Sequence, residues 1–303
     1  MSPPVEAASS NMRAIACMIA GQASFTANDT LIKLATAELP GGQAIFMRGV
    51  MAALMALTAC VAMGVLNVER LRGLGRLLVL RNIGEIGATF FFLFALFNMP
   101  IATTTAILQS MPLAITAGAA IFLGEPVGWR RWFATLVGFI GVLIIIRPGG
   151  EAFNVWSILA VMSVGFTVLR ELSPRLSVGA VPALLLVLLS AVTVTLAASS
   201  FSLFETWIVP APRSLLLLLG SATFIIGGYY LMVDAMRYGD VAIVSPFRYC
   251  AILWAILAGL LMWGERPDAM ALFGTGLVVA AGVYTFMRER RVKALAARSE
   301  AKR

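Results

Sequence analysis

The sequence predicts an all-α membrane protein whose ten transmembrane helices form two inverted repeats of five helices each. Of the 303 residues, 60% are hydrophobic and only 13% are charged, and the mean hydropathy is +0.92. A soluble domain of this size cannot cover so much apolar surface with so few charges. In addition, the two halves of the chain carry the same helix breaks in the same order, which indicates an internal duplication.

The duplication is clearest in residues 99–147 and 239–288. Each stretch begins with an apolar helix, continues through a Gly-Glu break followed by proline, and ends with a second apolar helix that finishes at an arginine. Glu125 and Glu265 lie 140 positions apart, and the extra residue Arg266 raises the offset to 141 afterwards. Agreement of this kind in register is not expected by chance, so we interpret the chain as two related halves.

Ten apolar stretches are long enough to cross a bilayer, which takes about 20 residues. They are separated by glycine and proline pairs and by a cluster of arginines at 70–76. The first repeat is predicted to cover residues 1–149 and the second 150–288, followed by a basic cytoplasmic tail at 289–303. The predicted spans are 12–35, 43–66, 77–98, 101–123, 131–147, 153–172, 180–200, 213–237, 241–263 and 269–288.

The basic residues predict the orientation. With the N-terminus inside, seventeen of the 23 Lys and Arg residues fall on the cytoplasmic side, four on the opposite side and two within spans. The positive-inside rule therefore places both termini in the cytoplasm. This bias also explains the net charge of +8, and no nucleic-acid partner is expected. Because five is an odd number, the second repeat enters the membrane from the opposite side. Inverted repeats of this kind are typical of secondary transporters, whose sites lie near the midplane between the halves.

The chain resembles the drug/metabolite transporter superfamily, in particular its ten-helix EamA-type members. The resemblance covers nearly the whole chain and is carried by Lys33, Pro40 and Arg48 in the first two spans and by the two Gly-Glu breaks. It implies a central cavity between the repeats, export of small metabolites by alternating access, and a bacterial inner membrane as the location. The phenylalanine-rich third span, with tryptophans in the sixth and ninth, is similar to aromatic amino-acid exporters. Amino acids, aromatic ones first, are therefore the expected substrates.

Polar residues within the first and third spans are candidate site residues, because such groups are costly when they face lipid. Gln22 shares one helix face with Asp29 and Lys33 and is expected to line the cavity; Lys33 either faces inward or pairs with Asp29. Glu85 lies about 12 Å inside the third span. It is expected to pair with Arg81 or Arg48, to exchange a proton, or to contact a substrate ammonium group.

The fourth and ninth spans supply further candidates. Gln109 and Tyr249 occupy equivalent positions, 140 residues apart, and a proline lies close to each. Proline frees a helix carbonyl, which is tolerated where a cavity or a neighbouring helix supplies partners. Arg248 is expected to bind a substrate carboxylate, or to be neutralised by a carboxylate such as Glu85 or by helix carbonyls. The remaining expected substrate-binding residues are Trp156, Ser163, Tyr230, Ser245 and Trp254, which are hydroxyl-bearing or aromatic side chains within spans.

Other classes of function are disfavoured by missing motifs. The sequence contains no histidine, no Walker A motif and no Gly-x-Ser-x-Gly motif, so neither an enzyme nor an ATPase is predicted. No metal and no cofactor are expected. A channel or a lipid-handling protein with the same inverted-repeat fold is the alternative reading. The expected partners are a small-molecule substrate and membrane lipids, with proton coupling left open, and the protein is expected to be a monomer or a weak dimer. Glu125 and Glu265 are expected to cap or tether the start of the helix that follows each of them.

Overall fold

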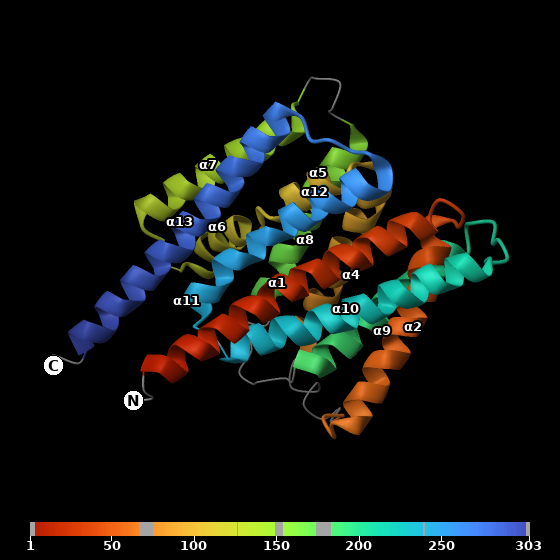
Figure 1. The fold of residues 1–303 in the computed structure, drawn as a ribbon, viewed down its shortest axis with the longest axis horizontal. Helices are drawn as coiled ribbons and strands as arrows, with labels where there is room; N and C mark the ends of the chain where they lie inside the picture. The colour runs from red at the N-terminus through yellow and green to blue at the C-terminus, as the bar shows by residue number, and fades with distance from the viewer. Residues whose placement is uncertain are drawn as a thin grey trace.

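The computed structural model describes residues 4–66, 75–125, 127–148, 154–173, 183–238 and 240–300. Within them, nine helical stretches are long and apolar enough to cross a membrane, and α1 (Pro4–Ala35), with 32 residues, provides a tenth crossing (Figure 1). All regular elements in this part of the chain are helical, so the prediction of an all-α membrane protein is confirmed. Five of the expected cytoplasmic cations lie outside the described residues: Arg70, Arg72, Arg175, Lys302 and Arg303.

The two repeats contain corresponding helices. The first repeat consists of α1, α2 (Gly41–Ala62), α4 (Gly75–Asn98), a divided crossing formed by α5 (Ile101–Leu108) and α6 (Met111–Leu123), and α7 (Trp129–Ile146). The second consists of α8 (Val155–Leu172), α9 (Ala183–Ser202), α10 (Pro212–Tyr238), a crossing divided into α11 (Val241–Val244), the 3₁₀ helix η2 (Ser245–Tyr249) and α12 (Cys250–Trp263), and α13 (Ala269–Glu300).

The most extensive helix packing joins the two repeats. Helix α1 lies against α10, α4 against α8, α2 against α9, and α7 against α13 (Figure 1). Exchanging the repeats leaves this pattern unchanged, because α1 corresponds to α8 and α4 corresponds to α10. The start of α1 and the end of α13 lie at the same end of the bundle, as an even number of crossings requires. The packing therefore has the approximate two-fold symmetry expected of duplicated halves.

Two equivalent close contacts show this symmetry at the level of single residues. A Cβ atom on Gly87 would lie 2.3 Å from the ring of Phe166, and a Cβ atom on Gly228 would lie 3.0 Å from the ring of Phe25. Gly87 and Gly228 are 141 positions apart, as are Phe25 and Phe166. In each case a glycine of one repeat accepts a phenylalanine ring of the other repeat, so the same contact occurs twice.

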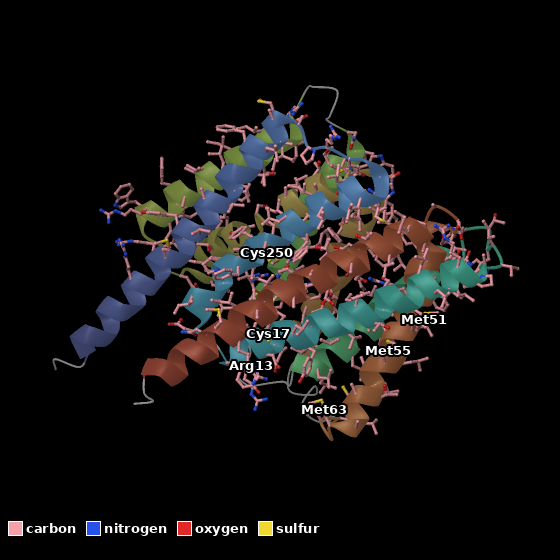
Figure 2. The ribbon with its side chains drawn as sticks, viewed as in Figure 1. Arg13, Cys17, Met51, Met55, Met63 and Cys250 are labelled. Atoms are coloured by element: carbon pink, nitrogen blue, oxygen red, sulfur yellow. The ribbon has the colours of Figure 1, made fainter. Side chains whose placement is uncertain are left out.

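The outer faces of the helices are apolar, as a membrane environment requires. Large side chains such as Phe133, Leu216 and Leu253 are more than half exposed. The cysteines are free: Cys60 is buried, whereas Cys17 and Cys250 are half-buried and lie within α1 and at the start of α12 (Figure 2). Polar residues are concentrated in the interior, where the candidate site is found.

Candidate functional site

The fourth and ninth crossings are interrupted at equivalent positions. Helix α5 ends at Leu108 before α6 begins, and η2 precedes the start of α12 at Cys250. Pro112 is the second residue of α6 and Pro246 is the second residue of η2, and a missing amide group is tolerated in the first turn of a helix. Helix α12 packs against α5, so the two interrupted crossings lie side by side. Discontinuous helices that meet between inverted repeats form the binding sites of many secondary transporters.

A hydrogen bond joins the two breaks. The Gln109 side chain donates from Nε2 to the backbone carbonyl of Arg248, at 2.8 Å. Gln109 belongs to the first repeat and Arg248 to the second, so this contact crosses the boundary between the repeats. Two of the predicted site residues, Gln109 and Arg248, are therefore brought together.

The Arg248 guanidinium group has no direct partner among the described residues. It interacts electrostatically with Glu171 and with Arg170 near the end of α8, but it forms neither a hydrogen bond nor an ion pair within that part of the chain. A cation in this position can accept the carboxylate or phosphate group of a ligand through two parallel hydrogen bonds.

Tyr249 and Ser245 are buried beside Arg248 in the same break. The Tyr249 hydroxyl has no hydrogen-bond partner within the described part of the chain, and a Cβ atom on Gly282 of α13 would lie 1.5 Å from it. Ser245 is 2% exposed. Trp254 lies further along α12 and is half-buried. The break thus combines a cation and two hydroxyl groups, and an indole ring follows one turn into α12.

Glu85 lies in a buried ionic cluster where α4, α8 and α9 meet. Its carboxylate lies 3.4 Å from Arg81 and 3.4 Å from Arg170, and it accepts a hydrogen bond of 2.9 Å from the Ser190 hydroxyl. Arg170 also pairs with Glu171 at 2.9 Å. Two carboxylates thus balance two guanidinium groups. Of the three roles considered for Glu85, these contacts support structural pairing, with Arg170 as a partner that the sequence did not indicate.

A second polar network joins α1, α2 and α10. Arg48 donates to the side-chain oxygen of Asn28 at 3.1 Å, and the Ser221 hydroxyl donates to the same oxygen at 2.7 Å. The Asn28 amide group in turn donates to Asp29 at 2.9 Å. Arg48 is therefore held by α1 rather than by Glu85.

Helix α10 places Tyr229 in the interior and Tyr230 on the outer surface. Tyr229 interacts electrostatically with Glu85 and Arg48, and its ring packs edge-on against Phe25 with centroids 5.3 Å apart. Tyr230 is 62% exposed, so the structure separates it from the other predicted site residues. Consecutive helix residues point about 100° apart, and Tyr229 is the interior residue that the sequence analysis missed.

Gln22 and Ser163 occupy equivalent positions in α1 and α8, 141 residues apart, and both are buried. Gln22 donates to the sulfur of Met18 at 3.8 Å, and the Ser163 hydroxyl donates to the Ala160 carbonyl at 2.7 Å. Each side chain thus bonds within its own helix. Trp156, in contrast, is partly buried and packs against an apolar cluster formed by α4 to α8 and α13.

At the end of the bundle away from the termini, acidic residues of the second repeat hold helix starts of the first. Glu265 accepts a hydrogen bond from the Ile101 amide, at the start of α5, at 3.1 Å. Glu205 accepts hydrogen bonds of 2.9 Å from the amides of Gly42 and Gln43, at the start of α2. A carboxylate at a helix start satisfies free amides and interacts favourably with the helix dipole.

The expectation that Glu265 caps the following helix is wrong. Asp268 does so instead, by accepting a hydrogen bond of 2.8 Å from the Ala271 amide. Lys33 does not pair with Asp29: its ammonium group lies 3.4 Å from Glu265 and donates to a backbone carbonyl at 2.5 Å. Both differences arise because Glu265 contacts two residues of the first repeat, the Ile101 amide and the Lys33 ammonium group.

Two more exposed ion pairs bridge the repeats at this end. Arg213 donates to Glu38 at 2.5 Å, and Arg147 pairs with Asp268. The Ser214 hydroxyl and the Arg213 guanidinium group lower the pKa of the Glu38 carboxyl. The Ala271 amide, followed by Arg147, lowers the pKa of the Asp268 carboxyl. Both carboxyl groups are thus stabilised in their charged form.

The fold and the site together define a duplicated membrane protein with discontinuous helices that meet between its repeats. The sequence pattern of the EamA-like transporter family matches residues 12–147 and again residues 153–287. The chain therefore belongs to the EamA-like transporter family, and the resemblance to EamA-type members of the drug/metabolite transporter superfamily is confirmed. It is a multi-pass membrane protein of a transporter family.

Curated relatives are transporters of small metabolites. The chain is 26% identical to the S-adenosylmethionine uptake transporter of Rickettsia bellii, over 88% of this chain and 91% of the relative. It is 27% identical to the pseudopaline exporter CntI of Pseudomonas aeruginosa, over 87% and 93%. The riboflavin transporter of Vibrio cholerae is 30% identical over 60% of this chain and 61% of its own length. A solved crystal structure superposes with a TM-score of 0.61 over 92% of this chain and 97% of its own chain, at 18% identity, which shows a shared fold.

Proposed function

We propose that the protein exports amino acids, aromatic ones first, across the bacterial inner membrane by alternating access, with both termini in the cytoplasm. The observation that carries the proposal is the Gln109–Arg248 contact, which places an arginine without a direct partner where two interrupted helices from different repeats meet. An arginine within a membrane span is costly unless it is paired. A substrate carboxylate would provide that pairing.

The neighbouring groups suit the rest of an amino acid. Arg248 would bind the α-carboxylate, while Gln109 and the Tyr249 hydroxyl would supply polar contacts. Glu171, which interacts with Arg248 and is 44% exposed, is the acidic group placed to attract the ammonium. Trp254 offers an aromatic surface for a planar side chain. Gln22, Ser163 and Ser245 are further interior polar groups that we assign to the cavity.

The names of the relatives support a carrier of small organic molecules. S-adenosylmethionine contains an amino-acid head group, and riboflavin contains a flat ring system. The ion pairs at the end away from the termini link the repeats, so we assign this structure to the state that is closed at that end. Transport would require these pairs to separate.

Counterflow in proteoliposomes tests the proposal. Vesicles preloaded with one unlabelled amino acid at a time are assayed for uptake of labelled phenylalanine or tryptophan, with a pH gradient added to test proton coupling. We expect saturable uptake that aromatic preload accelerates. Flux that does not saturate and is not competed would favour a channel. If no amino acid supports exchange by the folded protein, the amino-acid assignment fails.

Variants test the site itself. Arg248→Ala is expected to abolish counterflow while the protein remains folded, and Arg248→Lys is expected to restore part of it, because an ammonium keeps the charge but cannot bind bidentately. Arg266→Ala, in the exposed loop before α13, is the matched control and is expected to leave counterflow unchanged. Wild-type flux in purified Arg248→Ala would remove Arg248 from the site. Light scattering on the same samples measures whether the carrier is a monomer or a dimer.

A further inference from the structure

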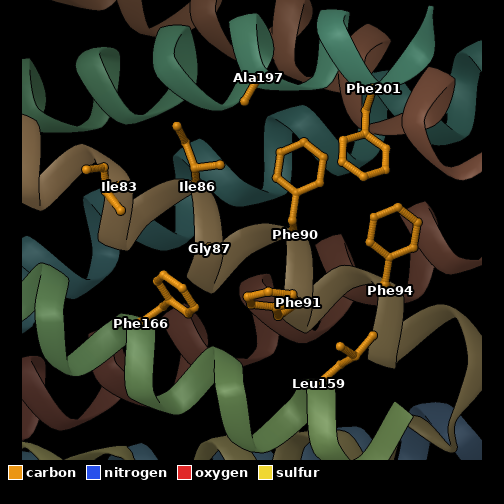
Figure 3. Close-up of a pocket in the computed structure, with 10 residues that line it drawn as sticks. All are labelled: Ile83, Ile86, Gly87, Phe90, Phe91, Phe94, Leu159, Phe166, Ala197 and Phe201. Carbon is orange, nitrogen blue, oxygen red and sulfur yellow. The ribbon is translucent and has the colours of Figure 1, made fainter. Parts of the chain in front are cut away.

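An apolar groove of about 690 Å³ lies between α4, α8 and α9. Figure 3 shows the side chains of all three helices arranged around the same space. No charged side chain and no polar side chain is among the lining residues. They are Ile83, Ile86, Gly87, Phe90, Phe91, Phe94, Leu159, Phe166, Ala197 and Phe201.

The groove follows a boundary between the two repeats, because α4 belongs to the first repeat and α8 and α9 belong to the second. The approximate two-fold symmetry provides an equivalent boundary between α10, α1 and α2, where three of the equivalent residues are fully buried. The residues 141 positions away from Leu159, Phe94 and Phe201 are Met18, Ala235 and Cys60. All three are 0% exposed. The groove is therefore a local departure from the symmetry of the fold.

The groove opens toward the outer surface of the bundle within the membrane-spanning region. Ile83 is 49% exposed and Phe201 is 53% exposed, and all three helices that form the groove are membrane spans. The phase that meets this opening in the cell is therefore the hydrocarbon of the bilayer. A water-filled groove with this lining would leave its water molecules without hydrogen-bond partners.

The dimensions match one leaflet of a membrane. On α4 the lining extends from Ile83 to Phe94, which corresponds to about 16 Å along a helix. One leaflet accounts for half of a hydrocarbon core of about 30 Å. Phe94 lies near the end of α4 at Asn98, and Ile83 lies beside the ionic cluster that Arg81 and Glu85 form deeper in the bundle. The membrane span of α4 covers Leu77–Asn98, so the lining from Ile83 to Phe94 passes through the middle of the span and ends closer to its Asn98 end.

We propose that this groove binds one acyl chain of a phospholipid from the leaflet nearer to Phe94 and Phe201. The acyl chain enters the groove near Phe94 and Phe201, and its methyl end reaches Ile83 and Ile86. Because no charged side chain lines the groove, the acyl chain rather than the head group determines binding. The lipid site is separate from the break that contains Arg248. The lipid proposal therefore does not depend on the proposed transport activity.

Photolabelling of the wild-type protein tests the site. The protein is placed in nanodiscs that contain a small fraction of phosphatidylcholine with a diazirine in one acyl chain, and adducts are mapped by mass spectrometry. We expect adducts on the groove residues of α4 and α9 to exceed those on Leu216 and Leu219 of α10 several-fold. These two leucines are also exposed to lipid. Equal labelling of the two surfaces would overturn the proposal.

A filled groove provides the second test. Ala197→Phe places a ring in the space, and labelling of α4 is expected to fall several-fold. Leu196→Phe adds the same ring at the adjacent position, which is 65% exposed and outside the groove, and is expected to leave labelling unchanged. If Ala197→Phe does not fold, the comparison of adducts on α4 and α9 with those on α10 in the wild-type protein still tests the proposal. Loss of labelling in the presence of excess phenylalanine would overturn the lipid assignment and make the groove part of the substrate path.

Discussion

The carboxylate of Glu265 accepts a hydrogen bond from the backbone amide of Ile101, although the two residues belong to different repeats. The same carboxylate pairs with Lys33, whose ammonium group also lies over the Trp263 ring, 4.8 Å from its centroid. One side chain therefore connects α1, the start of α5 and the loop before α13. This arrangement makes the end of the bundle away from the termini a junction between the repeats.

Replacing Lys33 with methionine is expected to destabilise this junction. The variant leaves Glu265 without its cation while keeping the length of the side chain. Because both side chains are largely buried, we expect the free energy of unfolding to fall by about 1.5–3 kcal/mol. Thermal unfolding of the purified protein in detergent measures the change. Glu265→Gln retains an oxygen for the Ile101 amide and should cost less than Glu265→Ala; equal losses would argue against the cap.

Glu85→Gln distinguishes the roles considered for that carboxylate. Removal of its charge leaves Arg81 and Arg170 without a shared partner, and breaking a buried ion pair typically costs about 3–5 kcal/mol. We expect a large loss of unfolding free energy, measured by denaturant titration in detergent. A variant with unchanged stability but an altered pH dependence of transport would contradict the pairing role and assign Glu85 to proton exchange.

Acid is expected to weaken the contacts between the repeats. The pKa values of Glu38 and Asp268 are lowered in the folded state, so their contribution is fully present above the unfolded carboxyl pKa of about 4. The contribution is lost as the pH falls through the lowered folded values. Unfolding temperatures measured across this range should decrease less in a Glu38→Gln/Asp268→Asn double variant than in the wild type. Parallel curves for the two proteins would refute the assignment.

Gly282→Ala tests the packing of α13 against the break in the ninth crossing. The added Cβ atom would meet the Tyr249 hydroxyl at 1.5 Å, and overpacking of this kind costs about 1–3 kcal/mol. Since Tyr249 must move, counterflow should also fall. Gly276→Ala is the matched control on the same helix, because a Cβ atom there meets nothing within 4 Å. Equal behaviour of the two variants would show that Tyr249 adjusts freely.

The architecture was predictable because it depends on properties that are local or periodic in the sequence. Long apolar stretches define the spans, and the offset between Glu125 and Glu265 defines the repeat. The repeat register placed Gln109 and Tyr249 in equivalent positions, and the proline near each indicated a freed helix carbonyl at that level of the span. None of these inferences required knowledge of which helices are neighbours.

The partners of the charged residues could not be predicted, because they depend on packing between the repeats. Arg170 reaches Glu85 from another helix, and Glu205 reaches the start of α2 from a segment about 160 residues away in the chain. One signal was available: neither Pro40 nor Pro100, before α2 and α5, offers a side-chain cap. A helix start without a local cap indicates that the cap comes from elsewhere.

Because residues of the second repeat cap helix starts of the first, the order of synthesis determines when these hydrogen bonds can form. Helices α2 and α5 are translated long before Glu205 and Glu265. Until those residues emerge from the ribosome, the first amides of both helices must be satisfied by water or by lipid head groups. The starts of α2 and α5 therefore gain their final hydrogen-bond partners only after Glu205 and the loop before the last helix have been made.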